Sequence, residues 1–188
     1  MKKLFTALIF TLATTVWAGD FEDGLAAHNK GDFTAAASLL QTVAEEGFST
    51  AQVILALMYE KGKGVPQDSA EAVHWYKLAA AQGNAYAQLS LGHVYSNGKG
   101  ILPDYAEAVR WYKLAAKQGD SSAQFNLAVI YNGVRGVSQD YAEAVRWYKL
   151  AAEQGNKSAQ YNLEVMYYSS EEVLQDYLQA HMRINLIH

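Results

Sequence analysis

The stretch YAEAVRWYKLAAKQG occupies residues 105–119, and YAEAVRWYKLAAEQG occupies residues 141–155, with Lys117 replaced by Glu153 as the one difference. Apolar residues recur every three or four positions, and the charged residues fall on the opposite side, which is typical of an amphipathic α-helix. Alanines near the middle of the apolar face allow a neighbouring helix to approach closely. A chain that contains this helix twice predicts two equivalent packing environments.

The repetition extends along most of the chain with a constant period of 36 residues. Glycines, Ala-Gln pairs and aspartates recur at this spacing: Gly47, Gly83, Gly119 and Gly155; Ala51, Ala87, Ala123 and Ala159; Asp32, Asp68, Asp104, Asp140 and Asp176. A fixed period in this range signals stacked supersecondary units, because a single unit cannot bury its own apolar face. The sequence therefore predicts an all-α solenoid of stacked antiparallel helix pairs, five in number, of which the last is truncated.

Each period also carries signals for the ends of its helices. In the third period Asp104 stands three residues before Glu107, the spacing of a capping box that satisfies free N–H groups at a helix start. Gly119 supplies the left-handed residue that closes the helix, and Asp120 can cap the next one. The same signals in the neighbouring periods predict two helices per repeat.

The N-terminus has the composition of a secretory signal peptide. Two lysines at positions 2 and 3 precede an apolar run over residues 4–16, which is too short to span a membrane, and Ala18 is a small residue at the expected cleavage site. We therefore expect residues 1–18 to be removed and the mature protein to be periplasmic or secreted.

Composition excludes several classes of protein. The chain has no cysteine, which excludes disulfides, thiolate metal sites, thiol catalysis and lipoprotein anchoring. Its net charge of −4 becomes −6 when the two N-terminal lysines are removed, and an acidic protein is a poor partner for nucleic acid or an anionic membrane. We expect no nucleic-acid partner, no insertion into a membrane and no cofactor.

The repeat can be written as A-Q-x-x-L-x-x-x-Y, then G-x-G-V/I, then D-x-A-E-A-V-x-W-Y-x-L-A-A-x-Q-G. This pattern resembles the Sel-one-like repeat (SLR) family of tetratricopeptide-like helical repeat proteins. The resemblance implies a right-handed superhelical scaffold that has no shared active site and binds other proteins, often in bacterial envelope assembly, signalling or host contact.

The resemblance also divides the chain. Three full repeats cover residues 49–156, and residues 19–48 resemble a divergent first helix pair with a shorter turn between its helices. Residues 157–188 resemble a partial last repeat, in which Arg183 replaces the tryptophan.

No catalytic or metal-binding constellation is evident. Ser96 and Lys99 have the S-x-x-K spacing of penicillin-recognising enzymes, but they lie at a helix end that leads into a glycine-rich loop, and no S-D-N or K-T-G follows. The histidines form no i, i+4 pair and no H-E-x-x-H motif. We expect a non-enzymatic protein; an enzyme that acts on peptidoglycan or β-lactams is the alternative.

Two sets of identical residues are interpreted as packing. The first set is expected to donate hydrogen bonds to neighbouring backbone, with a substrate-binding ladder as the alternative: Gln52, Gln88, Gln124 and Gln160. The second is expected to form a stacked core: Trp75-Tyr76, Trp111-Tyr112 and Trp147-Tyr148. A sugar- or peptidoglycan-binding module would require these rings to be exposed.

Function is expected where the repeats differ. We call the residues at equivalent positions in the first helix of successive repeats a column. One column contains Val53, Leu89, Phe125 and Tyr161, and the column one turn later contains Leu57, His93, Val129 and Val165. The column adjoining the first contains Ile54, Ser90, Asn126 and Asn162. Apolar and aromatic side chains mixed with short amides suit an extended peptide or a partner helix. We predict that five residues line a concave protein-binding groove: His93, Phe125, Asn126, Tyr161 and Asn162. Neutral drift on a solvated face is the alternative.

The last predicted helix has an apolar pair, Met182 and Leu186, on its outward side. Terminal repeats need a polar outer face to remain soluble alone. We therefore expect the C-terminal helix to be covered, by self-association or by a partner.

Overall fold

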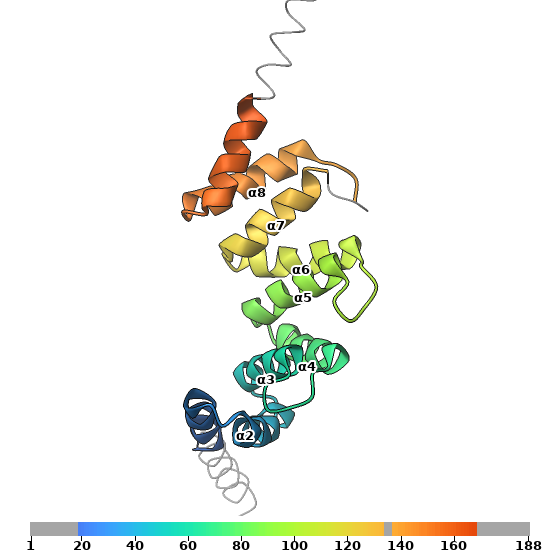
Figure 1. Ribbon diagram of the computed structural model, residues 1–188. Helices are drawn as coiled ribbons and strands as arrows, with labels where there is room; N and C mark the ends of the chain where they lie inside the picture. Colours follow the sequence, from blue (N-terminus) through green and yellow to red (C-terminus); the bar gives the residue numbers. More distant parts are fainter. Residues whose placement is uncertain (1–18, 134–136, 169–188) are drawn as a thin grey trace, which may run out of the picture. The chain divides into compact units, whose positions relative to one another are not determined.

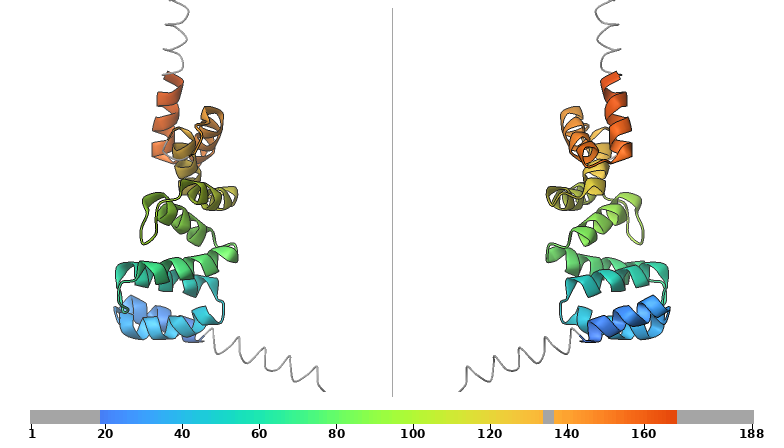
Figure 2. Two further views of the ribbon diagram at one scale, coloured as in Figure 1. Left: turned by 90° about the vertical axis from the view of Figure 1, so that its right-hand side faces the viewer. Right: turned by 90° about the vertical axis from the view of Figure 1, so that its left-hand side faces the viewer.

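The computed structural model describes residues 19–133 and 137–168, and every regular element in those ranges is an α-helix (Figures 1 and 2). The labelled helices are α2 (Phe33–Glu45), α3 (Ser49–Lys61), α4 (Ser69–Ala81), α5 (Ala85–Asn97), α6 (Tyr105–Lys117), α7 (Ser121–Tyr131) and α8 (Tyr141–Glu153). Residues 19–30 and 157–168 are also helical. The predicted signal peptide and the apolar pair Met182 and Leu186 lie outside the described residues.

The chain forms two compact units, one that ends at Leu114 and one that begins at Ala115. In the first unit α3 packs against both α2 and α4, and α4 packs against α5. In the second unit α7 packs against α8. Each of these contacts joins helices that are consecutive in the chain, as expected for stacked repeats. The predicted all-α repeat solenoid is confirmed.

The predicted helix caps are confirmed, with one difference. An Asp104 side-chain oxygen accepts a hydrogen bond from the Glu107 N–H at 3.0 Å, and an Asp120 oxygen accepts from the N–H of Ala123 at 2.7 Å. In a reciprocal capping box Glu107 would bind the N–H of Asp104. That N–H instead donates to the main-chain oxygen of Tyr95 at 2.8 Å, which leaves the glutamate side chain available for other partners.

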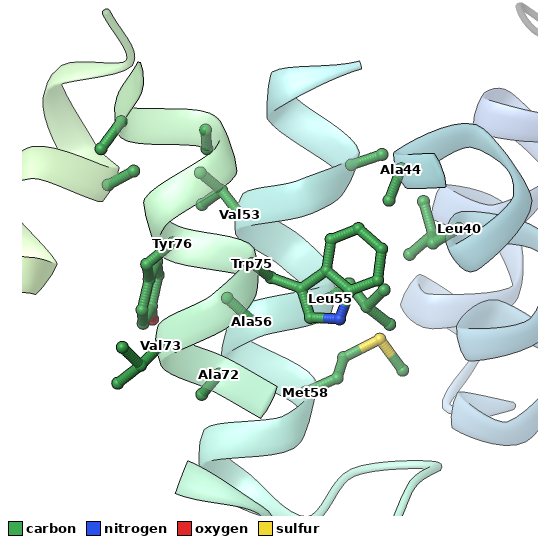
Figure 3. Close-up of a cluster of buried hydrophobic side chains, with 14 of the residues drawn as sticks. Leu40, Ala44, Val53, Leu55, Ala56, Met58, Ala72, Val73, Trp75 and Tyr76 are labelled. Carbon is green, nitrogen blue, oxygen red and sulfur yellow. The ribbon is translucent and has the colours of Figure 1, made fainter. Parts of the chain in front are cut away.

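The core of the first unit is built from large side chains that alternate with alanines (Figure 3). Leu40 of α2 and Leu55 of α3 are fully buried, and Met58 is 1% exposed. Trp75 and Tyr76 of α4 complete this cluster at 7% and 1% exposure. Burying a large apolar side chain contributes roughly 1.5–3 kcal/mol, so burial of this stack is the main stabilising term in a chain without disulfides.

The repeated glutamines bind the backbone of the preceding helix, as predicted. The side-chain nitrogen of Gln52 donates to the Ala44 carbonyl at 2.9 Å, and three equivalent bonds follow: Gln88 to Ala80 at 3.2 Å, Gln124 to Ala116 at 3.2 Å and Gln160 to Ala152 at 3.1 Å. The last carbonyls of a helix have no partner within the helix. Each glutamine therefore ties the first helix of a repeat to the end of the helix before it.

Candidate functional site

The five residues predicted to line a groove lie on three helices. His93 is on α5 in the first unit. Phe125 and Asn126 are on α7, and Tyr161 and Asn162 are in the helix of residues 157–168, all in the second unit. The five residues therefore fall into two groups, one in each unit.

His93 lies at the surface, where its ring meets a buried tyrosine edge-on. The ring centroids of His93 and Tyr112 are 5.6 Å apart with an interplanar angle of 72°. Tyr112 is 2% exposed, and its hydroxyl lies 3.2 Å from the hydroxyl of Ser96. Burial raises the pKa of Tyr112 to about 12, against a smaller opposing effect of the Ser96 hydrogen bond, so the phenol is neutral at physiological pH. His93 is thus an exposed residue whose ring contacts a buried tyrosine of the core.

In the second unit Tyr148 brings two of the predicted residues together. The Phe125 ring centroid lies 5.9 Å from that of Tyr148, with a tilt of 52°. The side-chain nitrogen of Asn162 donates to the Tyr148 hydroxyl at 3.1 Å. Tyr148 is 1% exposed, and this burial raises its pKa, while the bond from Asn162 acts in the opposite direction. Phe125, Asn126 and Asn162 are half-buried.

Tyr161 differs from these neighbours because its side chain is largely free of protein contact. It is 67% exposed, Val165 is 45% exposed and Tyr168 is 70% exposed. These three residues are spaced i, i+4 and i+7, so they share one face of the helix. We call them the terminal patch. The column pattern identified Tyr161 and Val165; the i+7 spacing to Tyr168 was a further signal in the sequence that the column comparison missed.

The column that contains Asn162 also has a structural role in the first unit. Ser90 makes a side-chain hydrogen bond to Tyr76, whose hydroxyl donates to a Glu60 carboxylate oxygen at 3.0 Å. Burial raises the pKa of Tyr76, and the nearby Glu60 charge raises it further. Variation between serine and asparagine in this column is therefore partly a variation in how each repeat binds its buried tyrosine.

The Trp-Tyr pairs belong to the core rather than to a ligand surface. Trp75 and Trp147 are 7% and 5% exposed, and the three tyrosines are at most 2% exposed. This burial agrees with the predicted stacking core, in which Trp111 is half-buried. A carbohydrate platform needs exposed ring faces, so these pairs do not support a sugar-binding surface.

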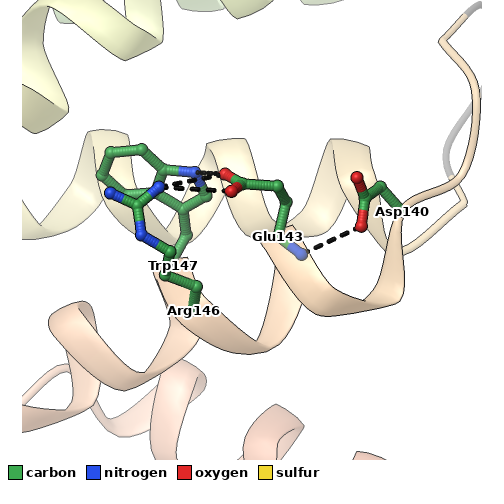
Figure 4. Close-up of polar contacts among 4 residues, drawn as sticks. All are labelled: Asp140, Glu143, Arg146 and Trp147. Carbon is green, nitrogen blue, oxygen red and sulfur yellow. Dashed lines mark hydrogen bonds and ion pairs between the residues drawn. The ribbon is translucent and has the colours of Figure 1, made fainter.

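Glu143, which is equivalent to Glu107, organises a polar cluster on α8 (Figure 4). The N–H of Asp140 donates to the main-chain oxygen of Tyr131 at 2.8 Å, so the Glu143 side chain is available for other partners. Asp140 accepts a hydrogen bond from the N–H of Glu143 at 3.0 Å. The Glu143 carboxylate accepts from the Trp147 indole at 2.8 Å and pairs with Arg146 at 3.2 Å. The Arg146 guanidinium lies over the Trp147 ring, 4.7 Å from its centroid. The capping-box spacing did not indicate this use of the glutamate.

The S-x-x-K pair is not arranged for catalysis. The Ser96 hydroxyl lies 3.2 Å from the Tyr112 hydroxyl, whereas the Lys99 nitrogen pairs with Glu60 at 3.6 Å. A serine nucleophile requires an adjacent base. Within the part of the chain that the structure describes, no cluster of histidine and acidic residues could hold a metal ion, and no helix is long and apolar enough to cross a membrane.

Comparison with known proteins identifies the repeat. The family model described as the Sel1 repeat matches residues 49–84, 85–120, 121–156 and 157–182. No curated protein matched the chain.

Solved structures include similar proteins from three organisms. A protective antigen of uropathogenic Escherichia coli with an SLR fold is 38% identical with a TM-score of 0.79, over 88% of this chain and 36% of that chain. A Sel1 repeat protein from Oxalobacter formigenes is 32% identical with a TM-score of 0.71, over 78% and 62% of the two chains. Helicobacter pylori cysteine rich protein B, at 22% identity, a TM-score of 0.51 and coverage of 60% and 90%, shows the fold alone. This chain spans little more than a third of the E. coli protein, 36% of its length.

Proposed function

Because the chain belongs to the Sel1 repeat family, we propose that it is a scaffold that binds a protein or peptide through α7 and the helix of residues 157–168. Sel1 repeat proteins are generally protein–protein interaction scaffolds. The partner would be a peptide or helix with an apolar face, held by aromatic anchors and fixed by amide hydrogen bonds.

The terminal patch is the observation that carries this proposal. Tyr161 and Tyr168 expose 67% and 70% of their surface, and Val165 on the same face exposes 45%. Aromatic side chains are enriched at the energetic centres of protein interfaces, because a ring buries a large area at a small cost in conformational entropy. Phe125 and Asn126, both half-buried on α7, would extend the surface. His93 would provide a separate contact in the first unit.

We also propose that the protein acts outside the cytoplasm, in the bacterial envelope. The basic, apolar and small-residue order over residues 1–18 supports export. The similar protein of uropathogenic Escherichia coli, a protective antigen, lends further support to this proposal. Intact mass of the protein recovered from the periplasm or medium should correspond to a chain that begins at Gly19. A mass that retains Met1 to Ala18 would contradict export by this signal.

A photo-cross-linking experiment tests the binding surface. A photoreactive benzoylphenylalanine at position 161 should capture a specific partner from envelope extracts, identified by mass spectrometry. The same residue at position 117, where Lys117 is exposed on α6, is the control and should not capture that partner. The purified partner should then bind Tyr161→Ala and Phe125→Ala proteins at least tenfold more weakly than wild type. Unchanged affinity in both folded variants would move the binding surface elsewhere.

A further inference from the structure

One position in the repeat has lost an aromatic ring. The first residue of the second helix of each repeat is Phe33 in α2, Tyr105 in α6 and Tyr141 in α8, but it is Ser69 in α4. This helix position is otherwise occupied by a ring in the described repeats. The helix pair of α3 and α4 therefore lacks a ring that the neighbouring helix pairs have at this position.

The loop of the following repeat comes close to this position both where a ring is present and where it is absent. A Cβ on Gly64 would collide with Phe33, and a Cβ on Gly100 would collide with Ser69. Both glycines have positive φ, 74° and 76°, so the loop can approach closely in this conformation. The loop therefore lies against the first residue of the helix at Ser69, as it does at Phe33.

The lysine that precedes each of these glycines shows what the missing ring would contact. Lys63 lies over the Phe33 ring, with its nitrogen 4.9 Å from the ring centroid. Lys99 occupies the equivalent position beside Ser69, finds no ring and instead pairs with Glu60 at 3.6 Å. Its side chain is 64% exposed, so it can reorient over an incoming ring without unfolding anything.

A cavity of about 250 Å³ lies at this place. Its walls include apolar residues of α4 and α5, Val73 and Val94, together with the buried ring of Tyr76. Its polar wall includes Ser69, Glu60 and Lys99. Sites for whole small molecules typically measure roughly 300–1,000 Å³, so this cavity is closer in size to a single side chain. We call it the Ser69 cavity.

We propose that the Ser69 cavity binds one aromatic side chain, tyrosine or phenylalanine, from a partner peptide. The ring would occupy the place that Phe33 occupies in the preceding repeat, between apolar walls and beneath the cation of Lys99. A flat ring is favoured over an aliphatic side chain because a lysine ammonium is attracted to the face of a ring. A charged side chain is disfavoured, because the walls of the cavity include the apolar side chains of Val73 and Val94. This inference rests on the proposed peptide-binding function but assigns a different surface.

The probes that test the cavity are N-acetyl-tyrosinamide and N-acetyl-phenylalaninamide, with N-acetyl-leucinamide as the aliphatic control. Titration followed by ¹H–¹⁵N NMR should shift the amides of Ser69, Val73 and Val94 in a saturable manner with both aromatic probes. The leucine probe should bind at least fivefold more weakly. Shifts that are absent at these residues, or equal for all three probes, would overturn the proposal.

A variant that restores the missing ring gives a second test. Ser69→Tyr should fold, because tyrosine begins α6 and α8, and it should weaken binding of the aromatic probes at least tenfold. Ser122→Tyr, at an exposed position of α7, is the matched control and should bind as wild type does. If Ser69→Tyr does not fold, Lys99→Met should weaken the aromatic probes at least threefold, with Lys61→Met as its control. Wild-type affinity in a folded Ser69→Tyr protein, or in Lys99→Met, would overturn the assignment.

The two proposals fail independently. If a partner is captured at position 161 but the probes do not bind near Ser69, the proposed scaffold function is supported and the proposed role of the Ser69 cavity is contradicted. If the probes bind to wild type but not to Ser69→Tyr, and no partner is captured at position 161, the proposed role of the Ser69 cavity is supported. The terminal patch is then not the surface that binds the partner.

Discussion

The side-chain amide of Gln88 donates a hydrogen bond to the main-chain oxygen of Ala80, 3.2 Å away, and both residues are buried. Gln160 makes the same bond to Ala152 at 3.1 Å, but Gln160 is exposed. The repeat thus provides the same hydrogen bond in a buried and in an exposed environment, so that the two can be compared.

We expect Gln88→Ala to lower the free energy of unfolding by about 1–3 kcal/mol, because it leaves a gap and removes a buried hydrogen bond that water cannot replace. Gln160→Ala should cost less than about 1 kcal/mol, since water can bind the Ala152 carbonyl there. Urea denaturation followed by circular dichroism measures both. Equal losses in the two variants would show that burial does not determine the strength of this bond.

Ala108 tests the packing of the repeated helix. It is 0% exposed in the middle of the apolar face of α6, so Ala108→Leu must displace its neighbours. Overpacking typically costs about 1–3 kcal/mol, and the thermal midpoint should fall accordingly. Ala106→Leu is the control, because Ala106 is exposed on the same helix and its replacement should change stability by less than about 0.5 kcal/mol. Similar effects of both substitutions would contradict the assigned helix phase.

The 36-residue period and the amphipathic pattern of the helices were sufficient to predict the fold. Packing in a stack of equivalent units depends on residues that recur at a fixed spacing. The role of Asn162 was not predictable in this way. It binds Tyr148, 14 positions away in the sequence. The amphipathic pattern does not show whether a polar side chain points toward solvent or toward a buried hydroxyl. The loss of a ring at Ser69 is visible in the sequence. The cavity beside it depends on the loop at Gly100, whose path only the structure shows.

Glu143 and Glu107 occupy the same position in repeats of nearly identical sequence but differ in their partners. Glu143 binds both Arg146 and the Trp147 indole, whereas Glu107 pairs with Arg110 at 3.4 Å. Glu143→Ala should therefore destabilise the protein by about 1 kcal/mol more than Glu107→Ala, because it also removes the hydrogen bond from the Trp147 indole, which solvent weakens at this partly exposed carboxylate. Chemical denaturation of both variants checks this difference. A larger loss for Glu107→Ala would contradict the network in Figure 4.

The buried tyrosines predict a loss of stability in alkaline solution. Burial raises the pKa of Tyr112 from 10.0 to about 12, so the folded state retains a proton that the unfolded state releases above about pH 10. The stabilisation is therefore fully present below pH 10 and falls as the pH rises toward 12. Tyr112→Phe should make the decline between these values shallower, measured as the free energy of unfolding against pH. Tyr141→Phe is the control, because position 141 is 58% exposed, and it should show the same decline as wild type. If stability declines equally in wild type and in both variants, burial of the Tyr112 phenol does not cause the alkaline loss of stability.

The adjacent residues Tyr161 and Asn162 should separate binding from stability. Tyr161 is 67% exposed, so Tyr161→Ala should change the free energy of unfolding by less than about 0.5 kcal/mol and still remove an aromatic anchor for the partner, at a cost of about 2 kcal/mol in binding. Asn162→Ala removes the hydrogen bond to the buried Tyr148 hydroxyl and should destabilise the fold by about 1 kcal/mol. Urea denaturation measures stability, and calorimetric titration with the partner captured at position 161 measures affinity. If Tyr161→Ala destabilises the fold as much as Asn162→Ala, the ring packs within the protein. If it leaves affinity unchanged, the terminal patch is not where the partner binds.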